Sequence, residues 1–495
     1  MERIDLMSNV RVRFAPSPTG APHIGNIRTA LFDWLFARHT GGKFILRIED
    51  TDKNREVPGG IDLLMESLRW YGLDWDEGPD VGGDYGPYIQ SQRLEHYRQY
   101  ADQLVASGHA YRAYDSEERL KAMREDQQRR GVSTGYDRRH RYLTESERAE
   151  YEASGAPYVI RLAAPTEGET TFQDAVFGEI THKNKVLDDA ILLKSDGFPT
   201  YHLASVVDDH LMEITHVFRG EDWIPSAPLH ILLYQALGWE PPIFVHLANM
   251  LGPDRKKLGK RFGSVEALAW RDQGYLIEAM FNFLALQGWS PREERDLFTR
   301  EELIEKFSID GLINRSPITD REKLDWFNGQ YIRALTLEEL TDRCLPFLEK
   351  AGLVRENLSE DELAYVRAVI ALEQERIHTL ADAPVLAEFF LRSDDEYAFD
   401  EKAVRKWLTH PGVGDRLKAV RAGFESLDTW TPETTEKVVR DVIAQFGVKN
   451  GEVIHPVRVS MSGRTEGPGL FEMIAVLGKE RSLRRIDRAL TFVSA

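Results

Sequence analysis

The sequence predicts an α/β fold: an open sheet that is interrupted by an α+β insertion and followed by an all-α region. Three observations predict this fold class. Strand-like and helix-like runs alternate over residues 10–71 and again over 198–247. A highly charged stretch and several short β-type runs lie between them. Beyond Thr336, hydrophobic residues recur almost only at helical spacing.

Length and composition describe a globular protein of several domains. A chain of 495 residues, with 42% hydrophobic and 29% charged residues, has room for roughly three to five domains. No apolar run approaches the roughly 18 residues that a membrane helix requires, and the first residues lack a secretory pattern. We therefore expect a cytoplasmic protein with no membrane partner. The single cysteine, Cys344, can form neither an internal disulfide nor a cysteine-based zinc site.

The net charge of −18 argues against a protein that coats nucleic acid indiscriminately, because affinity for a phosphate backbone comes from clustered cations. Binding of a nucleic acid on local basic patches stays open. An acidic remainder of the surface would even suppress nonspecific binding.

The first strand–loop–helix unit has the most distinctive sequence of the chain. A β-type segment, Val10–Phe14, leads into a loop, and residues 13–26 read RFAPSPTGAPHIGN. The amphipathic helix that follows carries on one face Ile27, Leu31, Trp34 and Leu35. Prolines stiffen the loop, while Gly20 and Gly25 let the main chain turn sharply and approach a ligand. The loop delivers His23 to the first turn of the helix, where N–H groups and the dipole favour a phosphate.

Acidic residues follow the second predicted strand, Lys43–Ile48. The strand ends in Glu49-Asp50-Thr51-Asp52, and helix signals follow from Pro58 to Tyr71. In an open parallel sheet, ligands bind outside the carboxyl ends of the strands, so these acids lie where a site is expected. A solvated acidic turn that caps the next helix is the structural alternative.

The middle of the chain interrupts the α/β pattern. A helix begins near Ser91, and a highly charged stretch runs over Glu117–Glu152. Short β-type runs follow at Tyr158–Leu162, Thr170–Val176 and Val186–Leu193. This pattern indicates an insertion between the two halves of a nucleotide-binding fold.

The α/β pattern resumes at Phe198–His210. A strand at Ile214–Phe218 ends in the polar run Arg219-Gly220-Glu221-Asp222-Trp223. A helix at Ser226–Leu237 and a strand at Phe244–Leu247 follow. Five histidines of this region match no metal-ligand spacing, so a structural role is favoured for His202, His210, His216, His230 and His246.

Two further stretches are rich in cations. Residues 252–263, GPDRKKLGKRFG, hold five cations between glycines, which repel each other unless an anion lies among them; a generic basic patch is the alternative. Helical patterns then continue through Glu278–Leu286 and Leu324–Arg333. The last helix carries the cations Lys479, Arg481, Arg484, Arg485 and Arg488. A solvated helix face explains those charges as well as a binding surface does.

Two loops carry a resemblance to a known family. His23-Ile24-Gly25-Asn26 resembles the His-Ile-Gly-His signature of class I aminoacyl-tRNA synthetases, and the surrounding Arg-Phe-Ala-Pro-Ser-Pro-Thr-Gly resembles the glutamyl and glutaminyl version. Lys257-Leu258-Gly259-Lys260-Arg261 is similar to the second signature, Lys-Met-Ser-Lys-Ser, in its glutamyl form Lys-(Leu or Ile)-Ser-Lys-Arg. Gly259 departs from the usual serine, which removes a hydroxyl donor and adds backbone freedom.

The resemblance covers essentially the whole chain and implies its domain organisation. The expected parts are a Rossmann-like class I synthetase catalytic domain at 8–90 and 195–248, an acceptor-end-binding insertion at 91–194, a stem-contact region at 249–333 and helical anticodon-binding domains at 334–495. Most glutaminyl enzymes would have a β-barrel in place of the last part.

The implied activity is ATP-dependent attachment of L-glutamate to the 3′ end of tRNA(Glu) through a glutamyl-adenylate, releasing AMP and pyrophosphate. The expected partners are ATP with Mg²⁺, L-glutamate and tRNA(Glu), and we expect a monomer. Some members of the family carry a structural zinc in the insertion. Here the corresponding segments, Tyr111–Asp115 and Asp137–Arg141, contain no cysteine, so we predict no zinc.

The resemblance also assigns roles to single residues. His23 and Lys260 are expected to be catalytic, the first by contacting ATP and the second by neutralising the departing pyrophosphate. The expected ATP-binding residues are Thr19, His23, Gly25, Asp222, Lys257 and Lys260. The expected glutamate-binding residues are Arg13, Ser17, Glu49, Asp52, Tyr201 and Arg219. Arg13 with Tyr201 would read the side-chain carboxylate, Arg219 the α-carboxylate and Glu49 the ammonium, although the residues alone leave open which arginine takes which end.

On the tRNA side, the family places an arginine at the position of Arg376 in enzymes that accept tRNA(Glu) and refuse tRNA(Gln). An exposed helix arginine is the structural alternative. A non-discriminating enzyme that also charges tRNA(Gln) is the nearest rival, and the all-helical carboxyl half disfavours a glutaminyl enzyme. Gly259 and Asn26 motivate a rival of another class, a non-catalytic tRNA-binding paralogue. A small-molecule adenylyltransferase of the same fold would leave the helical part unexplained.

Overall fold

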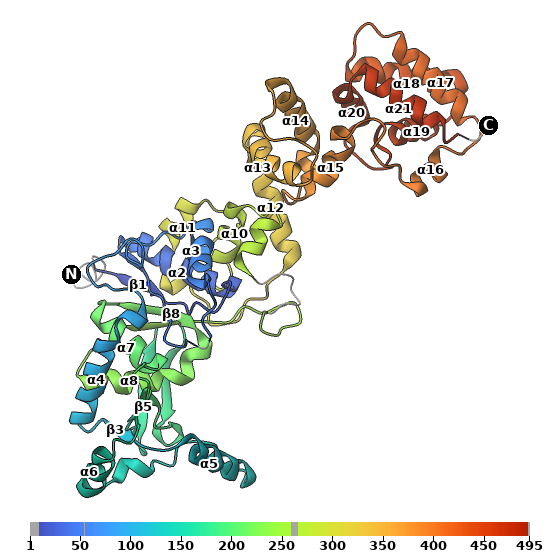
Figure 1. Cartoon of the computed structure of the whole chain (residues 1–495). Helices are drawn as coiled ribbons and strands as arrows, with labels where there is room; N and C mark the ends of the chain where they lie inside the picture. Colours follow the sequence, from blue (N-terminus) through green and yellow to red (C-terminus); the bar gives the residue numbers. More distant parts are fainter. Residues whose placement is uncertain (1–8, 54, 259–265, 494–495) are drawn as a thin grey trace. The chain divides into compact units, whose positions relative to one another are not determined.

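The structure of the protein is a computed structural model that describes residues 9–53, 55–258 and 266–493. These residues form two compact units (Figure 1). The first unit comprises the described residues up to Ala269 together with Met280–Arg321, and the second comprises Trp270–Ala279 and the chain from Glu322 onward. The five segments expected from the sequence stay a prediction, because the two units do not test their boundaries.

A parallel sheet forms the centre of the first unit. Strand β1 (Arg11–Phe14) pairs in parallel with β2 (Lys43–Leu46), and β8 (His216–Gly220) pairs in parallel with β9 (Ile243–Leu247). The N–H of Thr215, just before β8, donates to the carbonyl of Arg11 at 2.9 Å, so β8 runs beside β1. The strand order reverses between β1 and β8. In an open α/β sheet this reversal is the place where ligands bind.

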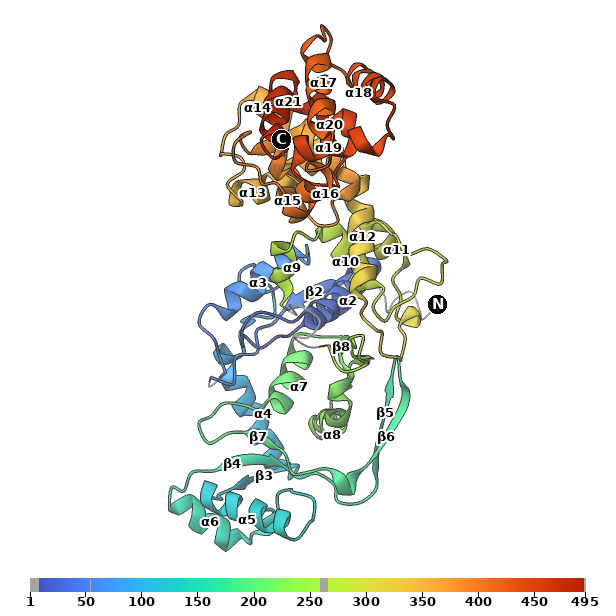
Figure 2. The same cartoon turned by 90° about the vertical axis from the view of Figure 1, so that its right-hand side faces the viewer.

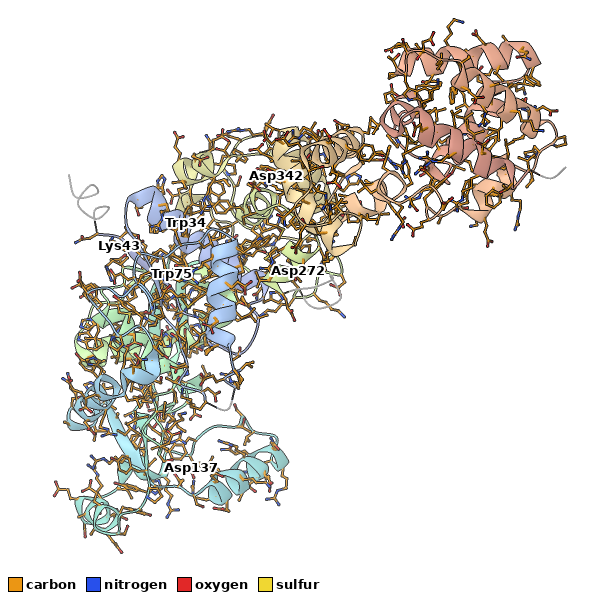
Figure 3. The ribbon with its side chains drawn as sticks, turned by 45° about the horizontal axis from the view of Figure 1, so that its top comes forward. Trp34, Lys43, Trp75, Asp137, Asp272 and Asp342 are labelled. Atoms are coloured by element: carbon orange, nitrogen blue, oxygen red, sulfur yellow. The ribbon has the colours of Figure 1, made fainter. Side chains whose placement is uncertain are left out.

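Helices follow the strands as the sequence predicts. The chain continues from β1 into α2 (Ile24–Thr40), from β2 towards α3 (Gly60–Trp70) and from β8 towards α8 (Ala227–Leu237), while α7 (Tyr201–Leu211) precedes β8. Helix α2 ends at Gly41, whose φ of 68° lies in the left-handed region that glycine adopts without strain. Trp34 on α2 and Trp75 lie inside this unit, with 4% and 8% of their surface exposed (Figure 3).

The insertion adds a second kind of sheet. An antiparallel sheet of order β3-β4-β7 is formed by Ala110–Ala113, Val159–Leu162 and Ile191–Leu193. It is accompanied by the helices α4 (Leu94–Ala106), α5 (Glu117–Arg129) and α6 (Glu145–Ala153). The strands β5 (Glu169–Asp174) and β6 (Gly178–Lys183) form a hairpin (Figure 2). The hairpin joins the parallel sheet, because Asp174 of β5 lies in register with Phe244 of β9.

The sequence interpretation missed two strands of the insertion, β3 and β6. Strand β6 reads GEITHK and contains Ile180 as its one strongly apolar residue, so its sequence lacks the alternation of apolar and polar residues that is typical of a half-buried strand. Strand β3 has only four residues and follows a helix directly. The β-type run predicted at Val186–Leu193 was too long, because a 3₁₀ turn occupies Asn184–Val186 and only Ile191–Leu193 pairs.

The described part of the second unit is all-helical. It includes the last residues of α9 (Ala267–Asp272), the first residues of α10 (Ile277–Ala285) and all but the first residue of α12 (Arg321–Ala334). It continues through α13 (Leu337–Lys350), α14 (Glu360–Glu373), α15 (Asp382–Leu391), α16 (Glu401–Trp407), α17 (Val413–Glu425), α18 (Pro432–Phe446), α19 (Gly451–Ser462), α20 (Leu470–Leu477) and α21 (Lys479–Leu490). This confirms the predicted helical region. One buried cluster of aliphatic and aromatic residues holds these helices together.

The basic last helix, α21, turns part of its cationic face inward. Arg485 is fully buried, and Arg481 donates to the carbonyls of Phe390 and Arg392 at 2.8 Å, at the end of α15. Cations at a helix C-terminus satisfy its last carbonyls and oppose its dipole. Only Arg484 keeps an exposed side chain among the three arginines that pair with Asp394. Most of these cations therefore form hydrogen bonds and ion pairs within the unit, and they do not make up a solvated helix face.

Candidate active site

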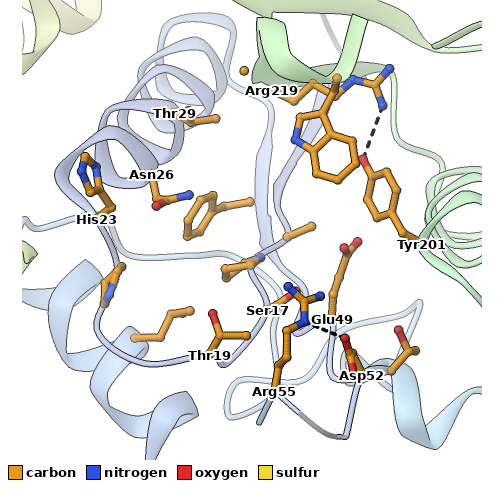
Figure 4. Close-up of a pocket in the computed structure, with 18 of the residues that line it drawn as sticks. Ser17, Thr19, His23, Asn26, Thr29, Glu49, Asp52, Arg55, Tyr201 and Arg219 are labelled. Atoms are coloured by element: carbon orange, nitrogen blue, oxygen red, sulfur yellow. Dashed lines mark hydrogen bonds and ion pairs between the residues drawn. The ribbon is translucent and has the colours of Figure 1, made fainter. Parts of the chain in front are cut away.

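A cavity of about 830 Å³ opens at the carboxyl ends of β1, β2 and β8 (Figure 4). Its walls come from the first loop, the start of α2, the acidic turn after β2 and the start of α7. Figure 4 shows His23 and Asn26 on one side of the cavity and Tyr201 and Arg219 across from them. The cavity thus lies where the strand order reverses, as expected of a ligand site in this type of sheet.

Most residues that the sequence predicted for the site line this cavity. The lining includes Arg13, Ser17, Thr19, His23, Glu49, Asp52, Tyr201 and Arg219. Gly25, Asp222 and Lys257 do not line it. Lys260 lies outside the described residues, and Arg376 belongs to the other unit.

The first loop is shaped by its turn residues. Gly20 has a φ of 121°, a backbone conformation that favours glycine, as its place in a sharp turn predicts. His23 caps α2, and its Nδ1 accepts the N–H of Gly25 at 3.0 Å. Burial lowers the pKa of His23, and the positive charge of Lys257 lowers it further. Near neutral pH the imidazole is therefore uncharged and can exchange hydrogen bonds with a ligand at the helix N-terminus.

The two described ends of the second loop lie against His23. The backbone of Leu258 lies close enough to the imidazole of His23 to raise its pKa, against the larger effect of burial. On the other flank, Glu266 forms an isolated antiparallel bridge with His23, and the N–H of Ala267 donates to the carbonyl of Pro22 at 2.9 Å. The described residues on the two sides of the second signature, Leu258 and Glu266, thus both lie beside the first signature.

Asp222 and Lys257 form an ion pair next to that entry point. The hydrogen bonds from Lys257 and from the side-chain amide of Asn249, which donates at 2.9 Å, lower the pKa of Asp222. Both side chains are more than half exposed, so the pair is accessible to a ligand and contributes little to stability.

Arg13 lies in a buried charge cluster with Arg47 and Asp209. The Nε of Arg13 donates to Asp209 Oδ1 at 2.9 Å, and Nη1 of Arg47 donates to the same oxygen at 2.8 Å. Burial alone would raise the pKa of Asp209, but the two guanidinium groups outweigh it and hold the pKa below its usual value. The positive charge of Arg13 is thus partly neutralised from within the protein.

Glu49 is the acid of this cluster that faces the cavity. Its Oε1 accepts from Arg47 Nη2 at 3.1 Å, and only 8% of its side chain is exposed. Burial raises the pKa of Glu49 to about 7, although the charges of Arg47 and Arg13 oppose this. An ammonium group bound here would favour the ionised form, so Glu49 is suited to a cationic part of a ligand.

Arg219 differs from Arg13 because its hydrogen-bond partners are uncharged. Its Nε donates to His246 Nε2 at 2.9 Å, and its Nη1 lies 3.1 Å from His230 Nδ1 and 3.4 Å from the hydroxyl of Tyr201. Its Nη2 is buried without a hydrogen-bond partner. In the part of the chain that the structure describes, no carboxylate lies within ion-pair distance of Arg219, which is itself only 5% exposed.

Sequence reasoning missed the partners of these arginines. Asp209 lies in the predicted run Phe198–His210 and was assigned no role, and neither were Asp174, His230 and His246. One signal was present, since His246 is a polar residue inside the otherwise apolar strand β9, where it needs a buried partner. The fold was needed to show that the partner is Arg219.

Hydrogen bonds and ion pairs connect the two insertion segments, Tyr111–Asp115 and Asp137–Arg141, that correspond to the structural zinc site of some family members. His140 Nδ1 lies 2.9 Å from Asp115 Oδ2, and the hydroxyl of Tyr136 donates to the same oxygen at 2.6 Å. Arg138 pairs with the buried Asp189 at 3.0 Å. Among the described residues, no group of three or more His, Cys, Asp or Glu side chains could hold a metal ion. The expected lack of zinc stays a prediction.

Arg376 lies in a 3₁₀ turn after α14 and forms an ion pair of 2.5 Å with Glu373. Glu373 is fully buried, and burial raises its pKa, whereas about a third of the Arg376 side chain is exposed. The arginine therefore has both an internal partner and an accessible edge. The structure leaves its role towards tRNA as a prediction.

Two family models match the chain. Residues 9–326 match the catalytic domain of class I tRNA synthetases (E and Q), and residues 339–490 match an anticodon binding domain. The first match contains every residue of the cavity. No described helix has the length and apolar character that crossing a membrane requires.

Similar proteins cover the chain from end to end. A glutamate–tRNA ligase of Moorella thermoacetica is 45% identical over 487 residues, which is 98% of this chain and 99% of the relative. A glutamate–tRNA ligase of Roseiflexus castenholzii is 48% identical and covers 98% of this chain and 97% of its own. The crystal structure of a glutamate tRNA ligase from Elizabethkingia meningosepticum, in complex with its amino acid, superposes with a TM-score of 0.89 at 37% identity, over 97% of this chain and 99% of that one.

Proposed function

The chain belongs to the class I tRNA synthetases of the E and Q type, and from this premise we propose that it attaches L-glutamate to the 3′ end of tRNA(Glu). The reaction has two steps. The α-carboxylate of glutamate first attacks the α-phosphorus of ATP, and the bond to the β-phosphate breaks to release pyrophosphate. A ribose hydroxyl of the terminal adenosine, the 2′ one by the family resemblance, then attacks the acyl carbon and displaces AMP.

Glutamate is held by opposite charges at three points. Arg219, whose Nη2 lacks a partner, binds one carboxylate, and Arg13 with Tyr201 binds the other. Glu49 takes the ammonium, since its pKa near 7 falls when a cation approaches. Ser17 and Asp52 line the same cavity and support this grip.

Positioning and charge stabilisation carry the first step. His23, Thr19 and the N-terminus of α2 bind the phosphates of ATP, which places the α-phosphorus in line with the glutamate carboxylate. The second loop, with Lys257 and Lys260, neutralises the pyrophosphate as it leaves. Asp222, the partner of Lys257, lies at the ATP side. Mg²⁺ bound with ATP would offset the charge of the phosphates and would be held mainly by them and by water.

One observation carries the proposal. An unpartnered guanidinium nitrogen, a buried carboxyl group with a pKa near 7 and an N-terminal helix cap all meet in one cavity. A diacid with an ammonium group complements the first two, and a triphosphate complements the third.

Aminoacylation with purified tRNA tests the function. We expect glutamate, ATP and tRNA(Glu) together to yield glutamyl-tRNA, with no product when ATP is omitted or when glutamine replaces glutamate. His23→Ala should reduce the rate by about a hundredfold, because it removes a group that contacts the reacting phosphates. A protein that binds tRNA(Glu) but forms no product with either amino acid would be the non-catalytic paralogue instead.

The expectations of a monomer, a cytoplasmic location and refusal of tRNA(Gln) rest on the sequence and on Arg376 and remain proposals. Sedimentation of the purified chain tests the first. Charging of both tRNAs tests the last.

A further inference from the structure

Arg219 is held by a chain of buried groups that begins on the insertion hairpin. Asp174 ends strand β5 of that hairpin, His246 lies on β9 and Arg219 on β8. Asp174 Oδ2 lies 2.6 Å from His246 Nδ1, and His246 Nε2 lies 2.9 Å from Arg219 Nε. Asp174 is 1% exposed and His246 is fully buried. We call this chain of hydrogen bonds the Asp174–His246–Arg219 relay.

Hydrogen-bond chemistry fixes the direction of the relay. An ionised carboxylate only accepts, so His246 carries its proton on Nδ1 and offers a lone pair on Nε2 to the Nε–H of Arg219. The other oxygen of Asp174 accepts the backbone N–H groups of Val176 and Phe177 at 2.9 and 2.8 Å, which orients the carboxylate. The uncharged tautomer of His246 is thereby the only one that satisfies both neighbours.

A second imidazole completes the setting. His230 Nδ1 faces Arg219 Nη1, and His230 Nε2 lies 3.2 Å from His202 Nδ1. Since a guanidinium only donates, His230 accepts on Nδ1 and donates from Nε2. Burial lowers the pKa of both His230 and His246, and the charge of Arg219 keeps them neutral. Two fixed acceptors thus hold Nε and Nη1 of the guanidinium, and among the described residues Nη2 is left without a partner.

From this geometry we propose that Asp174 and His246 are positioning residues for glutamate, which fix the orientation of Arg219 without neutralising its charge. The proposal rests on the role of Arg219 as a carboxylate ligand. A carboxylate in direct contact, as Asp209 is with Arg13, would compete with the substrate for the guanidinium. An imidazole between Asp174 and Arg219 supplies the orientation and leaves the charge of Arg219 for the substrate.

A purely structural role would look different. In that case the relay would only tie the hairpin to β9, and its loss would lower stability and all kinetic constants together. A positioning role predicts that the KM for glutamate changes while the KM for ATP does not, because the phosphates bind at His23 on the other side of the cavity.

The decisive comparison uses two amides at position 246. The amide of glutamine reaches the place of the imidazole Nε2, whereas the shorter amide of asparagine reaches only the place of Nδ1. We expect His246→Gln to keep an acceptor for Arg219 and to raise the KM for glutamate by no more than about threefold. We expect His246→Asn to raise it by about tenfold or more, with the KM for ATP unchanged.

Asp174→Asn tests the other end of the relay. Its amide NH₂ would face the Nδ1–H of His246, which forces the other tautomer and sets two N–H groups of His246 and Arg219 against each other. We expect a rise of about tenfold in the KM for glutamate. His216→Gln and His216→Asn are the matched controls, because His216 begins the same strand as Arg219 but does not line the cavity.

The kinetics are measured by aminoacylation of tRNA(Glu) with the full chain, together with melting temperatures. Equal KM values for glutamate in the two His246 variants, or parallel rises of both KM values, would overturn the proposal. If Asp174→Asn does not fold, the His246 pair decides. Arg219→Met distinguishes a failure of the proposed function from a failure of the relay. If this variant leaves the KM for glutamate unchanged, the proposed role of Arg219 is wrong. If it abolishes the use of glutamate while the Asp174 and His246 variants leave the KM for glutamate unchanged, only the relay is refuted.

Discussion

Buried arginines occur in both units of the protein, but their surroundings differ. In the helical unit, Arg485 is fully buried and donates to Asp394 at 2.8 Å, to the carbonyl of Phe389 at 2.6 Å and to that of Met461. Its guanidinium also stacks on the ring of Tyr397, 4.1 Å from the centroid. In the other unit, Arg219 is only 5% exposed, yet among the described residues one of its nitrogens has no partner and no carboxylate lies within ion-pair distance of it.

The difference shows how burial can serve either stability or binding. A buried charge is costly unless it is paired and hydrogen-bonded. Arg485 meets that condition within the protein, so its removal would leave several polar groups unsatisfied. Arg219 meets it only in part, and the missing partner is the kind of group that a carboxylate ligand supplies. Arg13 is intermediate, because Asp209 already shares its charge.

The largest expected effect lies in the helical unit. Arg485→Met should lower the free energy of unfolding by about 3 kcal/mol, because it takes this donor from the carbonyls of Phe389 and Met461 and removes one of the three arginine partners of Asp394. Chemical denaturation measures this loss. Arg484→Met is the matched control on the same helix; its side chain is 56% exposed, so it should change stability by no more than about 0.5 kcal/mol. Equal losses of stability in the two variants would contradict the expected difference between a buried and an exposed arginine.

Arg13→Gln should change the choice of amino acid. A guanidinium that binds a carboxylate leaves the amide of glutamine with an unsatisfied NH₂, so losing it should cost glutamate far more than glutamine. We expect the preference for glutamate over glutamine to fall by about a hundredfold. Pyrophosphate exchange in the presence of tRNA measures the rate with each amino acid. An unchanged melting temperature would show that the effect does not come from losing the ion pair with Asp209. Losses of equal size with both amino acids would refute the assignment of Arg13.

The raised pKa of Glu49 predicts a dependence on pH. Above its pKa of about 7 the carboxylate accepts the ammonium of glutamate, and below it the protonated form cannot. The KM for glutamate should therefore rise about tenfold as the pH falls from 8 to 6, while the KM for ATP changes less. Glu49→Gln should bind glutamate weakly and without this dependence. A flat profile in the unchanged protein would argue against Glu49 as the ammonium ligand.

The smallest expected effect concerns the choice of tRNA. Arg376→Gln should raise glutamylation of tRNA(Gln) severalfold relative to tRNA(Glu), because the exposed edge of the arginine no longer excludes the second tRNA. Charging of both tRNAs measures the ratio. Arg355→Gln is the control in the same unit, since Arg355 is 67% exposed and pairs with Glu362 on the surface. Efficient charging of tRNA(Gln) by the unchanged protein would rule out the discriminating interpretation.

Local sequence predicted the parts of the site that depend on local chemistry. The loop of residues 13–26, the acids after β2 and the polar run from Arg219 onward each follow a strand, and the rule for parallel sheets places strand ends together. Gly20 adopts the left-handed turn that its neighbours require. The helical carboxyl-terminal region followed from hydrophobic spacing alone.

Tertiary partners could not be predicted in the same way. Arg13 and Asp209 are 196 residues apart, and Asp174 and His246 are 72 residues apart. No spacing rule links residues across an insertion, so the histidines appeared only as structural. For the same reason the cations of α21 gave no sign of which of them face inward.

The central claim is that Arg219, whose internal pairing is incomplete, binds the substrate, whereas the fully paired Arg485 serves stability. One measurement tests it directly: the same change, to methionine, is made at Arg219 and at Arg485, and both the KM for glutamate and the free energy of unfolding are determined. The account predicts that Arg219→Met raises the KM by about two to three orders of magnitude and keeps stability within about 1 kcal/mol, whereas Arg485→Met lowers stability and keeps the KM. If both variants lose stability alike, and the KM for glutamate separates them by less than about threefold, the account is wrong.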